Sequence, residues 1–136
     1  MRDGQTRKLD SIPSDEGNLF ADYLKQWKVS VVILEGPAAG SEYLLEERQV
    51  GVGRGAANAI SIDDQAMSKA HAAFEFSDNS YRIRDLGSMN GTLLNGSEIR
   101  VAELKHGDRI RMGEHTFQLV LEKREARPRT YVLPDV

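Results

Sequence analysis

Residues 81–96 read YRIRDLGSMNGTLLNG. Apolar and polar residues alternate over 81–84, which predicts a half-buried β-strand. Two Asn-Gly steps follow, Asn90-Gly91 and Asn95-Gly96, and each is a strong signal for a tight turn because both residue types accept positive φ. The stretch therefore predicts a strand and two tight turns, with short amide and hydroxyl side chains exposed at the loop tips. A side-chain amide offers a donor and an acceptor together, which suits the recognition of an extended peptide backbone.

Strand signals of the same kind recur at short intervals on both sides of this stretch. Strands are predicted at 29–34, 41–45, 48–52, 60–62, 70–76, 81–84, 92–94, 98–101, 109–112 and 115–121. We expect 41–45 and 48–52 to pair with each other. Because no long helical period lies among these segments, the pattern predicts an all-β antiparallel sandwich of about ten or eleven short strands.

The two ends of the chain differ in composition from its centre. Residues 1–17 are charged and poor in apolar side chains, which predicts a flexible tail. Apolar residues at helical spacing then predict a short helix over 18–28, with Asn18 as its N-cap. The central domain is expected over 29–121, and the basic, Pro-containing residues 122–136 are typical of a linker or an outgoing helix.

The chain has 136 residues, of which 40% are hydrophobic and 29% charged, and this composition predicts one compact domain. It contains no cysteine, which excludes a disulfide framework, a Cys-ligated zinc site and a thiol nucleophile. The formal net charge is −3, so general nucleic-acid binding is not expected. No apolar run approaches the ~20 residues that cross a bilayer, and no secretory signal is recognisable. The sequence thus predicts a cytoplasmic protein without membrane contact.

A glycine-rich segment over 51–58, GVGRGAAN, suggests phosphate binding through backbone N–H groups and the Arg54 guanidinium. Its spacing fits neither the dinucleotide-binding pattern nor the Walker pattern. Taken alone, a hairpin turn with a solvated arginine explains this segment better than a phosphate site does.

Residues 67–72, MSKAHA, place a serine three residues before a histidine, a pairing that suggests hydrolase chemistry. Side chains this close in sequence rarely form a nucleophile–base pair, and no Gly-x-Ser-x-Gly elbow is present. His71 is better explained as a histidine at a strand start that hydrogen-bonds to neighbouring loops. The three histidines share no ligand spacing and Asp63-Asp64 lacks the rest of a calcium loop, so neither a metal nor another cofactor is expected. The sequence contains no catalytic constellation, and an enzyme is not predicted.

Six segments in their order along the chain resemble the forkhead-associated (FHA) domain, a family that reads phosphorylated peptides. They are Gly53-Arg54, Asn58-x-Ile60-x-Ile62, residues 67–72, residues 81–92, Leu94-Asn95-Gly96 and Leu104-Lys105-His106-Gly107-Asp108-x-Ile110-x-Met112-Gly113. The resemblance spans about residues 29–121. It implies an FHA-type sandwich whose loops at one end bind a phosphothreonine-containing peptide.

The resemblance also implies roles for individual residues. Arg54 matches the arginine that clamps the phosphate, Ser68 matches the serine that binds it, and Lys69 stands where members place a basic or polar phosphate contact. Asn90 matches the asparagine that holds the main chain of the peptide. The residues at loop-shaping positions of the family are Gly53, His71, Gly91, Thr92 and Asn95.

One position departs from the family pattern. Met89 stands where members usually have a Ser or Thr that helps to bind the phosphate, and a thioether does not replace a hydroxyl donor. Two interpretations follow. The chain is either a phosphothreonine-dependent binding module or an FHA scaffold that no longer reads phosphate.

The resemblance implies a regulatory or sensory domain of a larger signalling protein, fused to an effector such as a kinase or a diguanylate cyclase. Its expected partners are a phosphothreonine-containing protein and a Ser/Thr kinase. Thr6 in the N-terminal tail is followed by Leu9 at the third position after it, which family members commonly read. Phosphorylated Thr6 is therefore predicted to occupy the chain's own pocket or that of a neighbour, with an unmodified Thr6 as the alternative.

Overall fold

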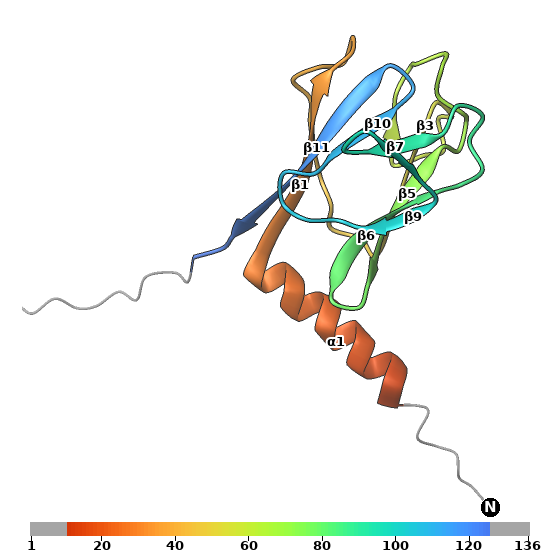
Figure 1. The fold of residues 1–136 in the computed structure, drawn as a ribbon. Coiled ribbons are helices and arrows are strands. Elements are labelled where there is room, and N and C mark those ends of the chain that lie inside the picture. Colours follow the sequence, from red (N-terminus) through yellow and green to blue (C-terminus); the bar gives the residue numbers. More distant parts are fainter. Residues whose placement is uncertain (1–10, 126–136) are drawn as a thin grey trace, which may run out of the picture.

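The computed structural model describes residues 11–125, which form one helix and a sandwich of two β-sheets (Figure 1). The six-stranded sheet has the order β2-β1-β11-β10-β7-β8, and the five-stranded sheet has the order β4-β3-β5-β6-β9. The elements of the described residues are α1 Ser11–Gln26, β1 Trp27–Glu35, β2 Glu42–Leu44, β3 Gln49–Gly53, β4 Ile60–Ser61, β5 Ala72–Ser77, β6 Ser80–Asp85, β7 Thr92–Leu94, β8 Ser97–Ile99, β9 Val101–Glu103, β10 Arg109–Met112 and β11 His115–Lys123. The prediction of an all-β sandwich of short strands is confirmed.

The core lies between the two sheets, and alternation is clear in β10, where Ile110 and Met112 are buried while Arg109 and Arg111 are exposed. β1 and β11 form the longest pair, in which Val31 lies opposite Leu119 and both are buried. The largest fully buried side chains include Tyr81, Phe74, Phe117, Ile33, Leu45, Ile60, Met67, Ile83, Ile110, Met112 and Leu119. This apolar layer fixes the strand ends from which the loops emerge.

The predicted pairing of 41–45 with 48–52 is wrong. β2 pairs with β1, where Tyr43 lies opposite Val31, whereas β3 pairs with β5, where Val50 lies opposite Phe74. Leu45 is fully buried, so the chain after β2 turns inward and crosses to the other sheet instead of closing a hairpin. β3 also pairs in parallel with β4, so the sandwich is not entirely antiparallel.

The strand predicted over 98–101 is divided between the two sheets. β8 pairs with β7, and β9 pairs with β6. The division falls at Arg100, whose carbonyl accepts a hydrogen bond from the Asp85 main-chain N at 2.7 Å. The alternating sequence continues without interruption through this residue, so it gives no sign of the crossing.

The helix begins and ends earlier than the predicted range 18–28. α1 starts at Ser11, so residues 11–17 are helical and do not belong to a flexible tail. Pro13 is compatible with this start because a proline in the first turn removes no helical hydrogen bond. Residues 1–10 and 126–136, which hold the rest of the predicted tail and linker, lie outside the described residues.

The strand that follows α1 is correspondingly longer than predicted. Trp27 and Lys28 belong to β1 and pair with Lys123 and Glu122 of β11, so β11 also extends past the predicted domain end at residue 121. Within the described residues, no helix has the length and apolar character needed to cross a membrane.

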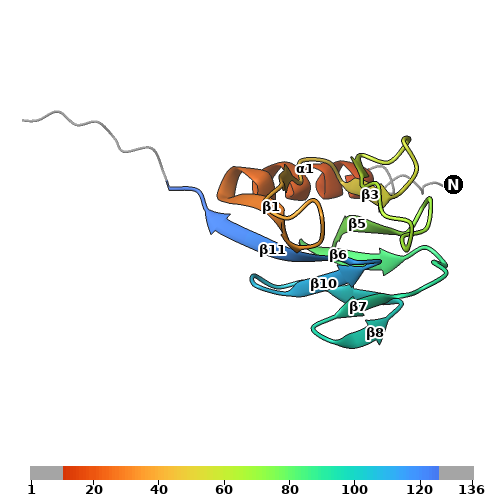
Figure 2. The same cartoon turned by 90° about the horizontal axis from the view of Figure 1, so that it is seen from above.

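α1 packs on the sandwich through an aromatic cluster. The ring centroids of Phe20 and Tyr23 lie 4.9 and 5.0 Å from that of Phe76, and both rings meet Tyr81 edge-on. Seen from above, α1 lies on the side of β1 and β3, away from β7 and β8 (Figure 2). Phe76 is near the end of β5 and Tyr81 near the start of β6, so α1 sits opposite the end where the loops after β3, before β5 and after β6 gather (Figure 1).

Candidate functional site

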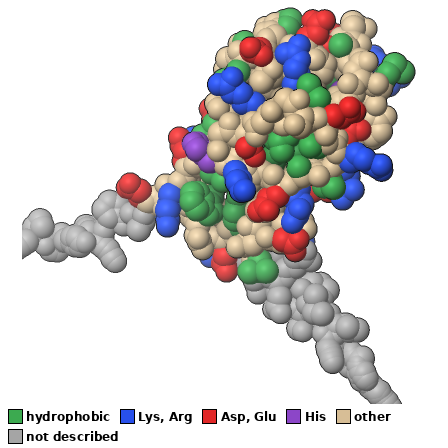
Figure 3. Space-filling model, viewed as in Figure 1, with side chains coloured by type: hydrophobic (Ala, Val, Ile, Leu, Met, Phe, Trp, Pro, Cys, Tyr) green, Lys and Arg blue, Asp and Glu red, His purple; other side chains and the backbone are tan. Residues whose placement is uncertain are grey.

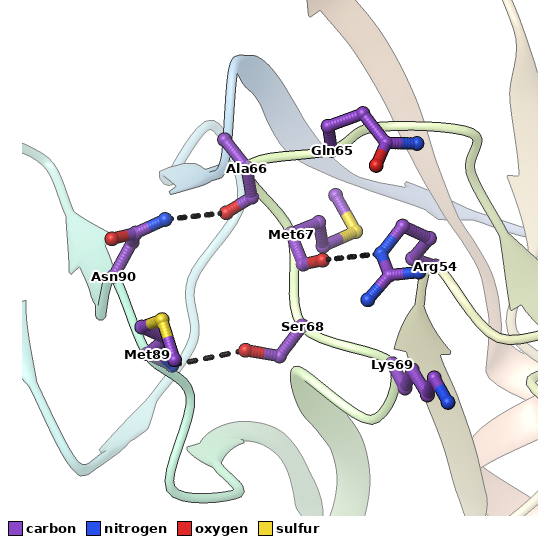
Figure 4. Close-up of a pocket in the computed structure, with 8 residues that line it drawn as sticks. All are labelled: Arg54, Gln65, Ala66, Met67, Ser68, Lys69, Met89 and Asn90. Carbon is purple, nitrogen blue, oxygen red and sulfur yellow. Dashed lines mark hydrogen bonds between the residues drawn. The ribbon is translucent and has the colours of Figure 1, made fainter.

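A cavity of about 180 Å³ opens at the loop end of the sandwich (Figure 4). It lies among the loops that follow β3, precede β5 and follow β6. Its lining residues are Arg54, Gln65, Ala66, Met67, Ser68, Lys69, Met89 and Asn90. The structure thus brings together the five residues to which the resemblance gave a role in phosphopeptide binding.

Arg54 follows β3 directly and is held at the cavity by two hydrogen bonds. Its main-chain N donates to the Ser68 carbonyl at 2.9 Å, and its Nε donates to the Met67 carbonyl at 3.1 Å. Figure 4 shows the guanidinium beside these residues, with its terminal nitrogens directed away from the Met67 carbonyl. The two terminal nitrogens of the Arg54 guanidinium, which can form bidentate contacts with phosphate oxygens, therefore stay available.

Gly53 permits the close approach of β3 to the loop before β5. A Cβ at this position would lie 2.1 Å from the Lys69 carbonyl oxygen and 2.9 Å from Asn58 Nδ2. Any side chain would force the two loops apart, so glycine is required by space at this position.

Asn58 is a site residue that the sequence reasoning did not single out. Its Nδ2 donates to the carbonyls of Gly55 at 2.8 Å and Lys69 at 2.6 Å, which fastens the arginine-bearing loop to the Ser68 loop. The signal was present, because Asn58 opens one of the six segments that resemble the family.

The Ser68 hydroxyl faces the cavity and is oriented by a backbone donor. Ser68 Oγ accepts a hydrogen bond from the Met89 main-chain N at 2.9 Å, so its own hydrogen remains free to donate (Figure 4). The side chains of Met89 and Lys69 are exposed at the cavity, and Met89 is 88% accessible.

Asn90 contributes one half of its amide to the protein and leaves the other half free for a ligand. Its Nδ2 donates to the Ala66 carbonyl at 2.8 Å, while Oδ1 points away from Ala66 (Figure 4). An acceptor fixed in this way can receive an N–H from the main chain of an extended peptide.

His71 connects the two loops that carry Ser68 and Asn90. It is fully buried; its Nδ1 accepts from the Ser68 main-chain N at 3.1 Å, and its Nε2 lies 2.9 Å from the Gly91 carbonyl. This pattern places the ring proton on Nε2, which donates to Gly91. Through these two contacts His71 ties the Ser68 loop to the loop that carries Gly91.

Asp85 is a second residue that the sequence reasoning missed. Its carboxylate accepts hydrogen bonds from the main-chain N of Gly87 and Ser88 and from the hydroxyls of Ser88 and Thr92. Burial acts to raise the pKa of Asp85, but these hydrogen bonds hold the pKa below its ordinary value. The segment that begins Asp85-Leu86-Gly87 has the composition of an Asx turn, which is the signal that could have identified it.

The remaining loop positions fall into two groups. Thr92 is fully buried and its hydroxyl donates to Asp85. Gly91 has φ +86, and a Cβ at this position would lie 2.9 Å from a side-chain oxygen of Glu98. Asn95 does not line the cavity: it turns the β7–β8 hairpin at φ 50 and binds the main-chain N of Arg109 through Oδ1 at 2.9 Å. Asn95 therefore braces the hairpin against β10.

The described residues thus form a sandwich of two sheets with a small cavity among its end loops. Comparison with known proteins agrees, because the family described as "FHA domain" matches residues 50–113. The oxoglutarate dehydrogenase inhibitor of Corynebacterium efficiens is 34% identical over 100 residues, which is 74% of this chain and 69% of that protein. The chain belongs to the FHA-domain family.

Other relatives are similar over the same region. The glycogen accumulation regulator GarA of Mycobacterium tuberculosis is 37% identical over 90 residues, or 66% of this chain and 54% of GarA, so the chain spans about half the length of that relative. The FHA domain of the CT664 protein from Chlamydia trachomatis superimposes with a TM-score of 0.64 at 29% identity, covering 68% of this chain and 96% of that domain. A solved FHA domain described for its phosphothreonine-dependent interactions also has a TM-score of 0.64, at 25% identity, covering 70% of this chain and 97% of its own.

Replacement of Asp85 by Asn is expected to lower the free energy of unfolding by about 1–3 kcal/mol at pH 7, because an amide nitrogen cannot accept the hydrogen bonds that the carboxylate accepts. The folded-state pKa of Asp85 lies below its ordinary value of 3.8, so its stabilisation is complete above that value and is lost as the pH falls through the lowered folded pKa. The difference between Asp85→Asn and the unsubstituted chain should therefore be constant near neutrality and shrink below pH 3.8. Denaturant unfolding at several pH values measures it.

Asp78→Asn is the matched control for this prediction. Asp78 is exposed in the β5–β6 turn at φ 57, a conformation that Asn also accepts. A loss of stability as large in Asp78→Asn as in Asp85→Asn would contradict the role assigned to the Asp85 hydrogen bonds.

Proposed function

We propose that this chain binds phosphothreonine-containing peptides in the cavity at the loop end of the sandwich. The guanidinium of Arg54, the hydroxyl of Ser68 and the ammonium of Lys69 bind the phosphate, and Asn90 binds the peptide main chain. The observation that carries the proposal is the convergence of Arg54 and Ser68 on one cavity, each oriented by a backbone hydrogen bond. A phosphothreonine brings about −1.5 to −2 charge and three acceptor oxygens, which match these donors.

The charge distribution favours a single bound phosphate over a polyanion. The chain carries a net charge of −3, and acidic and basic side chains are mixed over the face shown in Figure 3. Long-range attraction of nucleic acid requires a continuous basic surface. A local cationic site on an acidic protein accepts a single phosphate, whereas the acidic surface around it repels an extended polyanion such as nucleic acid.

A phosphate-independent scaffold remains the second candidate, and Met89 is the observation that favours it. The position that usually supplies a further hydroxyl here carries a thioether. Titration of the chain with a phosphorylated and an unphosphorylated form of the same peptide separates the two functions, since a scaffold would not distinguish them.

The proposed biological role is regulation through phosphorylation, with a Ser/Thr kinase and its phosphorylated target as partners in the cytoplasm. The names of the relatives support a regulatory, non-catalytic role, because one is an inhibitor of oxoglutarate dehydrogenase and another a regulator of glycogen accumulation. The effector, whether fused to the module or bound by it, is part of this proposal.

Arg54→Ala is expected to weaken phosphopeptide binding by about 2–4 kcal/mol, because it removes a charge-assisted contact and leaves the phosphate poorly paired. Isothermal titration with a phosphothreonine peptide measures the change. Arg82→Ala removes the same charge from an exposed pair with Asp78 and should bind as the unsubstituted chain does. Equal affinity of Arg54→Ala and Arg82→Ala would refute the assignment of the site.

Met89→Ser is expected to tighten phosphopeptide binding by about 0.5–1.5 kcal/mol, the net value of one added hydrogen bond. The main-chain N of Met89 already binds Ser68, so the substitution adds a hydroxyl without removing that contact. Met89→Ala is the control that removes the thioether alone. Weaker binding by both variants would mean that the methionine itself packs against the ligand.

The structure changes the prediction for Thr6, which with Leu9 lies outside the described residues. Ser11, where α1 starts, is the fifth residue after Thr6, and a chain of five residues reaches at most ~18 Å. α1 packs at the end of the sandwich opposite the cavity (Figure 1), and the six residues of β5 alone span roughly 20 Å. We therefore propose that phosphorylated Thr6 occupies the cavity of a second copy of the chain, unless α1 unwinds.

A peptide of residues 1–10 phosphorylated at Thr6 is expected to bind the Thr6→Ala chain more tightly than its unphosphorylated form. The full chain phosphorylated at Thr6 should associate with itself in sedimentation experiments, and Arg54→Ala should prevent this. Equal binding of the two peptides would end the proposal. A phosphorylated chain that stays monomeric yet no longer binds phosphopeptide would instead show docking within one chain.

A further inference from the structure

A buried acid–base pair lies directly behind the binding loops. Asp64 follows β4 in one sheet, His115 begins β11 in the other, and their side chains are 3% and 1% exposed. Asp64 Oδ2 and His115 Nδ1 are 2.7 Å apart. Neither residue lines the cavity described above.

The hydrogen-bond pattern fixes the state of this pair. His115 Nε2 accepts a hydrogen bond from the main-chain N of Ala38 at 3.2 Å, so the ring carries its proton on Nδ1. This N–H donates a hydrogen bond to Asp64. Burial acts to raise the pKa of Asp64, but the hydrogen bonds from His115 and from the main-chain N of Glu114 and Ala66 hold the pKa below its ordinary value. Asp64 is therefore a carboxylate whose donors come from its own turn and from the β10–β11 hairpin.

Two glycines allow the chain to close around the pair. A Cβ on Gly113 would lie 2.5 Å from Asp64 Oδ2, and a Cβ on Gly36 would lie 2.5 Å from the His115 ring. Both glycines have positive φ, at +61 and +110. The loop after β1, the turn after β4 and the β10–β11 hairpin are thus held against one another at Asp64 and His115.

The turn that Asp64 organises carries the acceptors for two cavity side chains. Asp64 Oδ1 accepts a hydrogen bond from the main-chain N of Ala66 at 2.8 Å, and the main-chain carbonyl of Asp64 accepts one from the main-chain N of Met67 at 3.0 Å. The carbonyl of Ala66 then accepts from Asn90 Nδ2, and the carbonyl of Met67 accepts from Arg54 Nε. The orientation of both ligand-binding side chains thus depends on the turn over 64–67.

We propose that Asp64, held by His115, is a positioning residue for phosphopeptide binding: it fixes the turn whose carbonyls orient Arg54 and Asn90. It acts through those two side chains and makes no contact with the ligand. The proposal rests on the proposed function for its effect on affinity, and on the structure alone for its effect on the two side chains.

Asp64→Asn tests the proposal, and Asp63→Asn, which removes an adjacent exposed carboxylate, is the matched control. An amide at position 64 has one acceptor oxygen, so it cannot accept both from Ala66 N, which binds Oδ1, and from Glu114 N and His115 Nδ1, which bind Oδ2. The turn should therefore lose part of its anchor. We expect Asp64→Asn to bind a phosphothreonine peptide, selected on the unsubstituted chain from a library, about tenfold more weakly than Asp63→Asn. Fluorescence of Trp27, far from the cavity, reports whether each variant is folded.

A double-mutant cycle separates positioning from general loss of structure. If Asp64 acts through Asn90, the Asn90→Ala substitution should cost less in the Asp64→Asn chain than in the unsubstituted chain. Additive losses, or an Asp64→Asn chain that binds as tightly as Asp63→Asn, would overturn the proposal. Where Asp64→Asn does not fold, His115→Phe, which removes the N–H donor to Asp64, replaces it in the same cycle and is judged by the same outcomes.

A ligand-free measurement keeps this test independent of the proposed function. The Nε–H signal of Arg54 and the side-chain amide signals of Asn90 in ¹H–¹⁵N spectra report their hydrogen bonds to the turn. We expect both to shift in Asp64→Asn and neither to shift in Asp63→Asn. If no phosphopeptide binds the unsubstituted chain, the proposed function fails while these shifts still decide the role of Asp64, and unchanged signals would overturn it.

Discussion

The cavity end of the molecule depends on the imidazole of His71, the buried group among the contacts that join the loop before β5 to the loop after β6. Its Nδ1 accepts a hydrogen bond from the main-chain N of Ser68, and its Nε2 donates a hydrogen bond to the carbonyl of Gly91. One buried ring therefore satisfies a backbone donor of one loop and a backbone acceptor of the other. Buried polar groups of the backbone must find such partners, because an unsatisfied group costs about 1–3 kcal/mol. This ring holds the two walls of the cavity at a fixed separation, together with the hydrogen bonds from Met89 N to Ser68 Oγ and from Asn90 Nδ2 to the Ala66 carbonyl.

The same device is repeated around the cavity with different side chains. Asn58 fastens the Arg54 loop to Lys69 by a hydrogen bond, and Asp85 accepts hydrogen bonds from main-chain N–H groups of the loop before Gly91. In each case a short polar side chain replaces the hydrogen bonds that a β-ladder would provide. The side chains of Arg54, Ser68 and Asn90 are thus held in place in the free chain, and little of their conformational entropy remains to be lost in the proposed binding of a peptide.

The sequence allowed the sandwich to be predicted because strands and turns depend on short-range signals, whereas the cavity residues were predicted from the resemblance of six segments to the FHA family. Alternation over 81–84 and 109–112 follows from burial of one face, and the Asn-Gly steps encode their own turns. The pairing of β2 and β3 was predicted wrongly because sheet membership depends on where Leu45 is buried, which local sequence does not report. Asn58 and Asp85 were overlooked for a related reason: their importance lies in which distant or adjacent backbone groups they satisfy, and a polar residue in a loop looks the same whether or not it has such partners.

Met89 shows how the architecture limits the effect of a change in sequence. Its main-chain N, not its side chain, orients the Ser68 hydroxyl, so the departure from the family pattern leaves that hydroxyl in place. The thioether offers no hydrogen bond to a phosphate, where a hydroxyl would donate one. It also adds an apolar group that is 88% exposed at the cavity rim. Arg54 and Asn90 are held by carbonyls of the loop before β5 and do not depend on the side chain at position 89. The backbone therefore positions Arg54, Ser68 and Asn90 whatever side chain stands at position 89, and in the proposed phosphothreonine site Met89 lowers the number of phosphate contacts without disturbing the others.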